Sequence, residues 1–167
     1  KTVKDALSLK VPHLSLYSLT VEENSVFGKK GYKSLDEDTE ADMYEYIVDT
    51  LVKYGYHQYE IANFCLPGYE SKHNLGYWHY DDYLALGPGS TSKYNHQRIE
   101  KTNNIKTYLN NSELIENIEI LSNEDEAFEN LMMSLRLEEG LNISVFKDKY
   151  RFNPLDYYSE AIKKNSN

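Results

Sequence analysis

One short segment gathers the side chains best suited to bind a large planar ligand. Residues 71–80 contain His73, Asn74, Tyr77 and the only tryptophan, Trp78. Imidazole is a common axial ligand of heme iron, and flat aromatic rings suit a porphyrin face. On a helix His73 and Tyr77 would share one face, because they are four residues apart. The alternative is structural, since such side chains often hold a loop against a sheet.

Two other chemistries find little support in the residue spacing. His57, Cys65, His73 and His79 lie within 23 residues, but their spacing matches no familiar zinc pattern. No Gly-x-Ser-x-Gly segment occurs, and nothing links a particular serine to a particular histidine. The sequence therefore predicts neither a zinc site nor a hydrolase.

A carboxylate and an amide stand together near residue 60. On a strand, Gln58 and Glu60 share one face, with Tyr59 and Ile61 on the other. One of these pairs is expected to point into a crevice, where a carboxylate could bind a cationic or hydroxylated ligand. A solvated edge or a satisfied salt bridge is the alternative.

Composition limits the class of protein. The 167 residues carry a formal charge of −9, which disfavours nucleic acid as a partner. No apolar run is long enough to span a bilayer, no signal-type segment is present, and the chain begins at Lys1. The single cysteine, Cys65, stands among apolar neighbours and is expected to be buried in a protein of a reducing compartment. We therefore expect a cytoplasmic protein.

The elements that position these residues begin with a strand–helix–strand unit. Alternating apolar residues predict strands at 13–19 and 57–64, and a capping box at Thr39–Asp42 with Gly55 at the far end predicts a helix over 39–54. If the two strands are parallel neighbours, their polar ends share one edge of a sheet. That edge would hold Ser18, Thr20 and Asn63.

The second half of the chain is expected to be mainly helical. An apolar run at 83–86 enters a glycine-containing segment, Gly87–Ser92, and after about residue 98 the pattern predicts helices rather than strands. Ser122–Asp125 is a capping box, followed by a predicted buried stripe of Phe128, Leu131, Met132 and Leu135. Further helices are predicted at 142–150 and 154–164.

Several segments, in this order and spacing, resemble the radical-SAM coproporphyrinogen-oxidase-like family and especially its heme-chaperone branch. The segments are His13-Leu-Ser-Leu-Tyr-Ser-Leu-Thr20, Asp36-Glu-Asp-Thr-Glu-Ala-Asp-Met-Tyr44, Gln58-Tyr-Glu-Ile-Ala-Asn-Phe64, His73-Asn-Leu-Gly-Tyr-Trp78, Tyr83-Leu-Ala-Leu-Gly-Pro-Gly89 and Leu131-Met-Met-Ser-Leu-Arg-Leu137 with Glu139-Gly140.

The resemblance implies an α/β fold: the C-terminal part of an incomplete radical-SAM β/α (TIM-like) barrel in residues 1–98, and the start of a small, mostly helical C-terminal domain in residues 99–167. Family members bind a [4Fe-4S] cluster through a Cys-x-x-x-Cys-x-x-Cys motif, which is absent here. The cluster and S-adenosylmethionine are therefore expected in a longer parent protein, whose missing N-terminal half would be a partner of this chain.

The resemblance also assigns residues. The His-Asn-x-x-Tyr-Trp motif is associated with heme binding, which implies heme contacts from His73, Asn74, Tyr77 and Trp78. Position along the barrel suggests S-adenosylmethionine contacts from Ser18 and Thr91, although family members commonly have Gly-Ala-His-Ser where this chain has Gly89–Ser92. For the crevice we expect Gln58, Glu60 and Asn63.

The function implied is that of a fragment of a radical-SAM heme chaperone, which binds heme and transfers it to an apo-protein but cannot cleave S-adenosylmethionine without the cluster half. The alternatives are a fragment of an oxygen-independent coproporphyrinogen III oxidase, which performs an oxidative decarboxylation, and a scaffold that binds neither ligand. Half a barrel exposes sheet edges, so a homodimer through such an edge is a further expectation.

Overall fold

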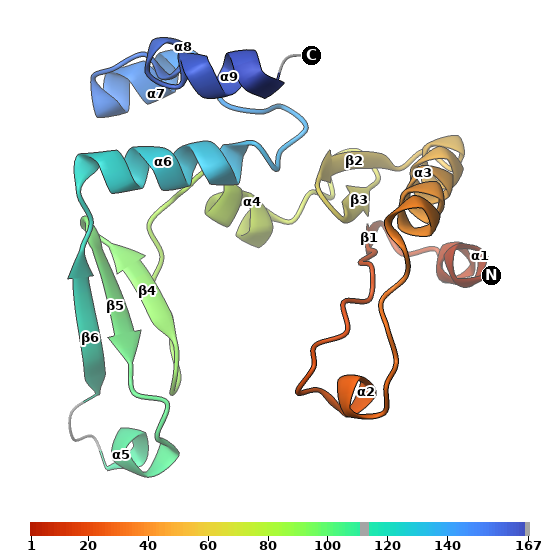
Figure 1. The fold of residues 1–167 in the computed structure, drawn as a ribbon, viewed down its shortest axis with the longest axis horizontal. Coiled ribbons are helices and arrows are strands. Elements are labelled where there is room, and N and C mark those ends of the chain that lie inside the picture. The colour runs from red at the N-terminus through yellow and green to blue at the C-terminus, as the bar shows by residue number, and fades with distance from the viewer. Residues whose placement is uncertain (111–113, 166–167) are drawn as a thin grey trace. The chain divides into compact units, whose positions relative to one another are not determined.

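The computed structural model describes residues 1–110 and 114–165 and divides into two compact units, Lys1–Ser71 and Lys72–Asn167 (Figure 1). Within the described residues, no helix combines the length and apolar character needed to cross a membrane. The predicted boundary near residue 98 concerns the domains of the longer family proteins and stays a prediction.

The first unit combines helices with a small three-stranded sheet. Its elements are α1 (Thr2–Ser8), β1 (His13–Ser15), α2 (Val26–Lys29), α3 (Glu37–Lys53), β2 (His57–Glu60) and β3 (Asn63–Cys65). The strand order is β1-β3-β2, and β3 is antiparallel to both neighbours. The predicted pairing of residues 13–19 with residues 57–64 as parallel neighbours is therefore wrong.

A turn explains the difference. The predicted strand 57–64 breaks at Ala62, whose φ is +77°, and the chain reverses to form β3 between β1 and β2. A positive φ is unusual for a residue with a Cβ, so the apolar pattern gave no sign of this reversal. Residues 57–65 form a hairpin, and β1 ends at Ser15, short of the predicted Leu19.

Helix α3 has the predicted C-terminus and a different N-terminus. Asp36, rather than Thr39, caps it, since the Asp36 side chain accepts a hydrogen bond from the Thr39 amide at 2.9 Å. At the other end Gly55 has φ +85°, and the Tyr56 amide bonds back to the Leu51 carbonyl, which is a Schellman closure. Leu51 and Phe64 are fully buried in the core that α1 and α3 form with the sheet.

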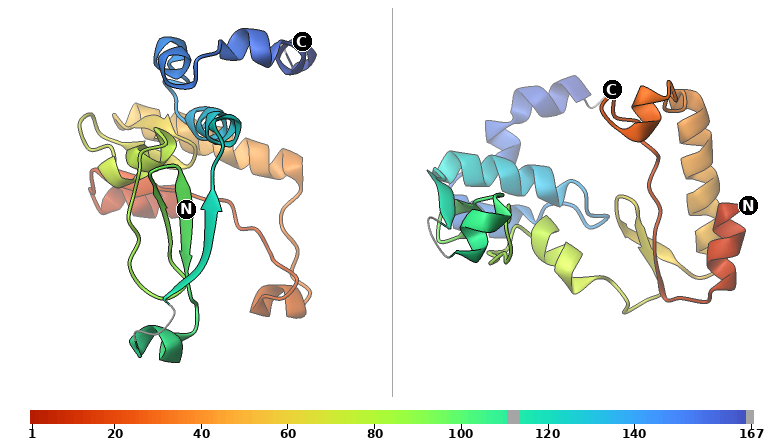
Figure 2. Two further views of the ribbon diagram at one scale, coloured as in Figure 1. Left: turned by 90° about the vertical axis from the view of Figure 1, so that its left-hand side faces the viewer. Right: turned by 90° about the horizontal axis from the view of Figure 1, so that it is seen from below.

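The second unit contains an antiparallel sheet followed by helices. Its elements are α4 (Lys72–Trp78), β4 (Thr91–Tyr94), β5 (Gln97–Lys101), α5 (Ile105–Leu109), β6 (Ile115–Ile120), α6 (Asn123–Ser134), α7 (Ile143–Tyr150), α8 (Pro154–Tyr157) and α9 (Ser159–Asn165). Figure 2 shows β4, β5 and β6 side by side, with α5 beyond one end of the sheet.

The prediction of helices rather than strands after residue 98 is wrong for β5 and β6. Every residue of β6 is exposed, so the strand lacks the one-sided burial that makes periodicity readable. The run 83–86 forms no extended strand; Tyr83 makes a single bridge to Lys93.

Helix α6 confirms its predicted cap but not its predicted buried stripe. Ser122 and Asp125 form the capping box. The buried residues of this helix are Glu126, Ala127, Asn130 and Ser134, whereas Phe128 and Met132 are about half exposed. Polar partners decide the buried face here: Asn130 donates to the Tyr150 hydroxyl and accepts from the Ser134 hydroxyl, both at 3.0 Å.

The predicted helix 142–150 is confirmed as α7, which begins after its Asn142 cap. The predicted helix 154–164 divides into α8 and α9.

Candidate functional site

Helix α4 carries the four residues that the sequence associates with heme. His73 and Tyr77 lie on one face, and their rings meet edge to face with centroids 4.9 Å apart. Tyr77 continues the contact to Tyr83, at 4.7 Å between centroids. The His73 side chain is exposed, and Tyr77 is 37% exposed. An imidazole and a phenol ring are thus presented together at the surface.

A pocket of about 280 Å³ lies beside this face. His73, Tyr77 and Tyr83 line it, together with Lys72, Gly76, Asp81, Asp82 and Leu84. Burial raises the pKa of the Tyr83 hydroxyl, while a hydrogen bond from the Lys93 ammonium lowers the pKa of Asp82. At neutral pH the pocket wall therefore combines aromatic rings with charged groups of both signs.

Asn74 and Trp78 do not line the pocket. Arg136 follows α6 in the chain. Its guanidinium group lies over the Trp78 ring, 5.1 Å from the ring centroid. The indole Nε1 of Trp78 is buried without a hydrogen-bond partner among the described residues. The structure therefore places His73 and Tyr77 at the pocket, whereas Trp78 contacts Arg136, two residues beyond the end of α6.

The predicted crevice residues fall into two groups. Glu60 and Asn63 are each 1% exposed, and the Asn63 amide donates to Glu60 Oε1 while Asn63 Oδ1 accepts from the Ser15 hydroxyl. Glu60 Oε2 is buried without a hydrogen-bond partner among the described residues. Gln58 instead donates to the Tyr44 hydroxyl of α3, at 2.6 Å. The expected alternation of faces fails because the pairing shifts register between Gln58 and Glu60.

The two residues suggested for S-adenosylmethionine belong to different units. Ser18 follows β1 and lines an apolar groove of about 580 Å³ in the first unit, with Leu16, Leu19 and Ile47 among its neighbours. Thr91 is the first residue of β4 in the second unit and pairs with Glu100. The structure does not bring these two residues together within one unit.

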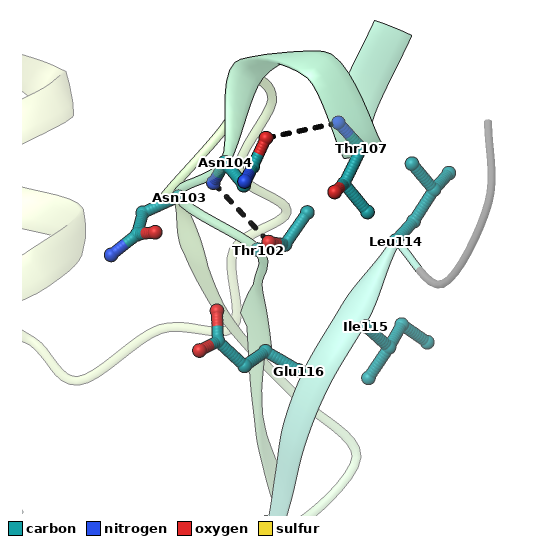
Figure 3. Close-up of a pocket in the computed structure, with 7 residues that line it drawn as sticks. All are labelled: Thr102, Asn103, Asn104, Thr107, Leu114, Ile115 and Glu116. Carbon is teal, nitrogen blue, oxygen red and sulfur yellow. Dashed lines mark hydrogen bonds between the residues drawn. The ribbon is translucent and has the colours of Figure 1, made fainter. Parts of the chain in front are cut away.

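A further hollow, of about 720 Å³, lies between α5 and the start of β6 (Figure 3). Its lining combines Thr102, Asn103, Asn104 and Thr107 with Leu114, Ile115 and Glu116. The Asn104 side chain caps α5 and already accepts from the Lys106 and Thr107 amides. Figure 3 shows the bond to Thr107. No residue singled out from the sequence lies here, and Glu116 is the only ionisable side chain in this lining.

The structure adds one group that the sequence did not predict. His57 and Cys65 face each other across the β2–β3 hairpin, and Glu70 joins them from the following turn. Burial raises the pKa of the Cys65 thiol to about 11, and the nearby Glu70 charge adds to this. The prediction that Cys65 is buried is confirmed, since it is 0% exposed. Only the pairing of the two strands could have revealed the cluster.

Comparison with known proteins shows which proteins this chain resembles. Residues 121–164 match the family model described as the HemN C-terminal domain. The chain is 37% identical over 166 residues to a protein named heme chaperone HemW from Lactococcus lactis, covering 96% of this chain and 44% of the relative. It is 34% identical to the heme chaperone HemW of Bacillus subtilis, over 89% of this chain and 41% of the relative.

A solved structure shares the fold. It is described as coproporphyrinogen III oxidase (HemN) from Escherichia coli, a radical SAM enzyme, and it superposes with a TM-score of 0.75 over 97% of this chain and 42% of that chain, at 15% identity. At that identity the likeness concerns the fold alone. The chain spans less than half the length of the relatives described here. It is similar over nearly all of its own length to heme chaperones named HemW, and its residues 121–164 match the HemN C-terminal domain model.

Proposed function

We propose that this chain is the heme-binding part of a heme chaperone and that His73 and Tyr77 form its contact with heme. The observation that carries the proposal is the exposed His73 imidazole packed against Tyr77 at the mouth of a pocket. A neutral imidazole supplies an axial ligand to heme iron, and an aromatic ring packs against a porphyrin face.

The residues fit heme as a partly exposed ligand. A pocket of about 280 Å³ is slightly smaller than the usual range for small-molecule sites, about 300–1,000 Å³. It would take an edge of the macrocycle and leave the rest accessible, with Lys72 available to pair with a propionate. Partial exposure suits a carrier that hands its ligand to an apo-protein, and we propose such an acceptor as a partner.

Trp78 has a positioning role in this proposal. Trp78 packs under Arg136 and so fixes the orientation of α4, which in turn directs His73 toward the pocket. Trp78 and Asn74 remain candidates for direct contact only if heme extends beyond the pocket lining.

The polar cluster of Ser15, Glu60 and Asn63 is proposed to contact a second ligand in the longer protein. A buried carboxylate oxygen without a hydrogen-bond donor is costly, and a hydroxyl or cationic group of a ligand would satisfy it. Ser18 and Thr91 remain proposed S-adenosylmethionine contacts. When bound, that molecule and the [4Fe-4S] cluster would supply radical chemistry that this chain has no cysteine set to support.

The apolar groove beside Ser18 is the proposed contact with the remainder of the longer protein. Tyr17 and Leu19 on its wall are 73% and 66% exposed, and burying them against a covering segment would be favourable.

A homodimer through a sheet edge remains a proposal. The single cysteine supports the expected cytoplasmic location, because disulfide-rich chains belong to oxidising compartments.

A heme titration tests the proposed function. The parent chain should show saturable binding by visible absorbance, and His73→Ala should weaken the binding and alter the Soret band. His79→Ala is the matched control, because His79 is also an exposed histidine next to α4 but is paired with Glu139 at 2.7 Å. Equal curves for parent and His73→Ala, or no binding by the parent, would contradict the proposal.

A further inference from the structure

Three different metal-ligand side chains converge on the β2–β3 hairpin of the first unit. His57 on β2 and Cys65 on β3 are directly opposite each other in the antiparallel register. Directly opposite residues project to the same face of the sheet. Glu70 reaches this face from the turn that follows β3. The sequence separates these residues, and the hairpin brings them together.

The distances describe a single point of convergence. Cys65 Sγ lies 3.7 Å from His57 Nε2, and His57 Nε2 lies 3.0 Å from Glu70 Oε1. The three ligand atoms all lie within 4.8 Å of one another. Around a tetrahedral zinc ion, with a Zn–S bond of about 2.3 Å and Zn–N and Zn–O bonds of about 2.0–2.1 Å, ligand atoms are separated by about 3.3–3.6 Å. Small side-chain adjustments would close the difference.

The same distances argue against a nucleophilic triad. In such a triad the base uses one ring nitrogen for the nucleophile and the other for the orienting carboxylate. Here the same nitrogen, Nε2 of His57, faces both Cys65 and Glu70. One nitrogen cannot accept a proton from the thiol while it donates a proton to the carboxylate. The lone pairs of this nitrogen, the Cys65 sulfur and a Glu70 oxygen can, however, all point at one cation.

We propose that His57, Cys65 and Glu70 bind one borderline-soft divalent cation of the Zn²⁺ class. Thiolate, imidazole and carboxylate together form a typical ligand set for zinc, and hard cations such as Mg²⁺ prefer oxygen ligands alone. Binding displaces the thiol proton: Zn²⁺ and the protonated Cys65 give a zinc thiolate and one H⁺ released to solvent. This proposal is independent of heme binding, which concerns the other unit.

Burial leaves one side of the site open. Cys65 is fully buried, whereas the His57 and Glu70 side chains are 43% and 30% exposed. The cation would therefore sit over the sheet face with its fourth position toward solvent, where water could complete the tetrahedron.

The turn carrying Glu70 is already held in place by hydrogen bonds. The Gly68 amide donates to Glu70 Oε1 at 3.3 Å, and the Leu66 amide donates to the Pro12 carbonyl at 2.9 Å. Such outer contacts orient a ligand before the metal binds. A bound cation would cross-link β2, β3 and this turn.

Cobalt titration tests the site. We would add Co²⁺ to the tag-free chain, stripped of metal and kept reduced without thiol reagents, and record the absorption spectrum. The parent should show a thiolate-to-cobalt charge-transfer band and visible bands typical of tetrahedral Co²⁺, and Zn²⁺ should displace both. Cys65→Ser should remove the charge-transfer band. His57→Gln or Glu70→Gln should weaken cobalt binding at least about 100-fold, because loss of a direct ligand should cost no less than the most that loss of an outer-shell partner costs.

The control is His79→Gln, which removes a histidine that is paired with a carboxylate in the other unit. It should leave the cobalt spectrum and affinity unchanged. A parent without a charge-transfer band, or a Cys65→Ser variant that keeps it, would overturn the proposal. X-ray absorption of the zinc-loaded parent requires no variant, and it should show one sulfur ligand at about 2.3 Å; a shell of nitrogen and oxygen alone would equally reject the site.

Discussion

His73 and Tyr77 meet edge to face on α4, with ring planes 89° apart and centroids separated by 4.9 Å. This contact fixes the direction of an exposed imidazole without burying it. A ligand can therefore reach the histidine at little cost in side-chain ordering.

The Tyr77 ring should matter more for heme binding than its hydroxyl. We expect Tyr77→Ala to weaken heme binding about 10-fold, since an aromatic contact contributes up to about 1.5 kcal/mol. Tyr77→Phe keeps the ring and should bind like the parent. The measurement is a heme titration of both variants, and equal weakening in both would mean that the hydroxyl, not the ring, makes the contact.

The helical part of the second unit should depend on Phe146. This residue is 1% exposed and packs on Ala127 and Tyr150. Phe146→Ala should lower the free energy of unfolding by about 3–5 kcal/mol through lost burial and a cavity. Phe128→Ala is the control, because Phe128 is 51% exposed and its replacement should cost less than about 1 kcal/mol. Urea unfolding compares them, and a larger effect at Phe128 would mean that the predicted stripe is the buried one after all.

Arg98 joins three elements of the second unit. Its guanidinium donates to Glu119 on β6 and to Glu129 on α6, and these carboxylates raise the pKa of Arg98 further. Arg98→Lys should reduce the free energy of unfolding by about 1–2 kcal/mol, because a single ammonium cannot reproduce the planar fork. The loss should shrink at high salt. Arg151→Lys, at an exposed helix end, is the control for the chemical change itself, and equal melting temperatures for the two variants would contradict the prediction.

The Asp82–Lys93 pair predicts an acid-sensitive contribution to stability. Lys93 Nζ is 2.8 Å from Asp82 Oδ1, and the Lys93 side chain is only 6% exposed. The hydrogen bond from Lys93 lowers the pKa of Asp82 below its usual value of 3.8. Stability from a lowered carboxyl pKa is complete above the unfolded-state value and disappears as the pH falls through the folded-state value.

Asp82→Asn should therefore lower the free energy of unfolding at pH 7 by about 1–2 kcal/mol. The loss is smaller than for a fully buried ion pair because the Asp82 side chain is 46% exposed. The difference from the parent should decline once the pH is below 3.8. Thermal melts at a series of pH values measure this. Asp81→Asn is the neighbouring control, and a difference that stayed constant down to the lowest pH would reject the linkage.

The sequence by itself determined the features that depend on neighbouring residues. The capping box at Ser122 and Asp125 and the closure of α3 at Gly55 both involve contacts within about one helical turn. Such contacts are encoded locally, so residue types and spacing were sufficient. The family resemblance rested likewise on the order of segments along the chain, and the comparisons confirmed it.

Only the tertiary structure decided which strands pair and which helix faces are buried. The reversal at Ala62 inserts β3 between β1 and β2, and no local preference indicates a positive φ at an alanine. The sequence did not predict strand β6, because all of its residues are exposed. Without a buried face, apolar and polar residues need not alternate along the strand. The face of α6 is set by Asn130 and its partner Tyr150, 20 residues away. The His57–Cys65–Glu70 cluster has the same origin, because strand pairing between residues distant in sequence is a property of the folded chain and not of any one segment.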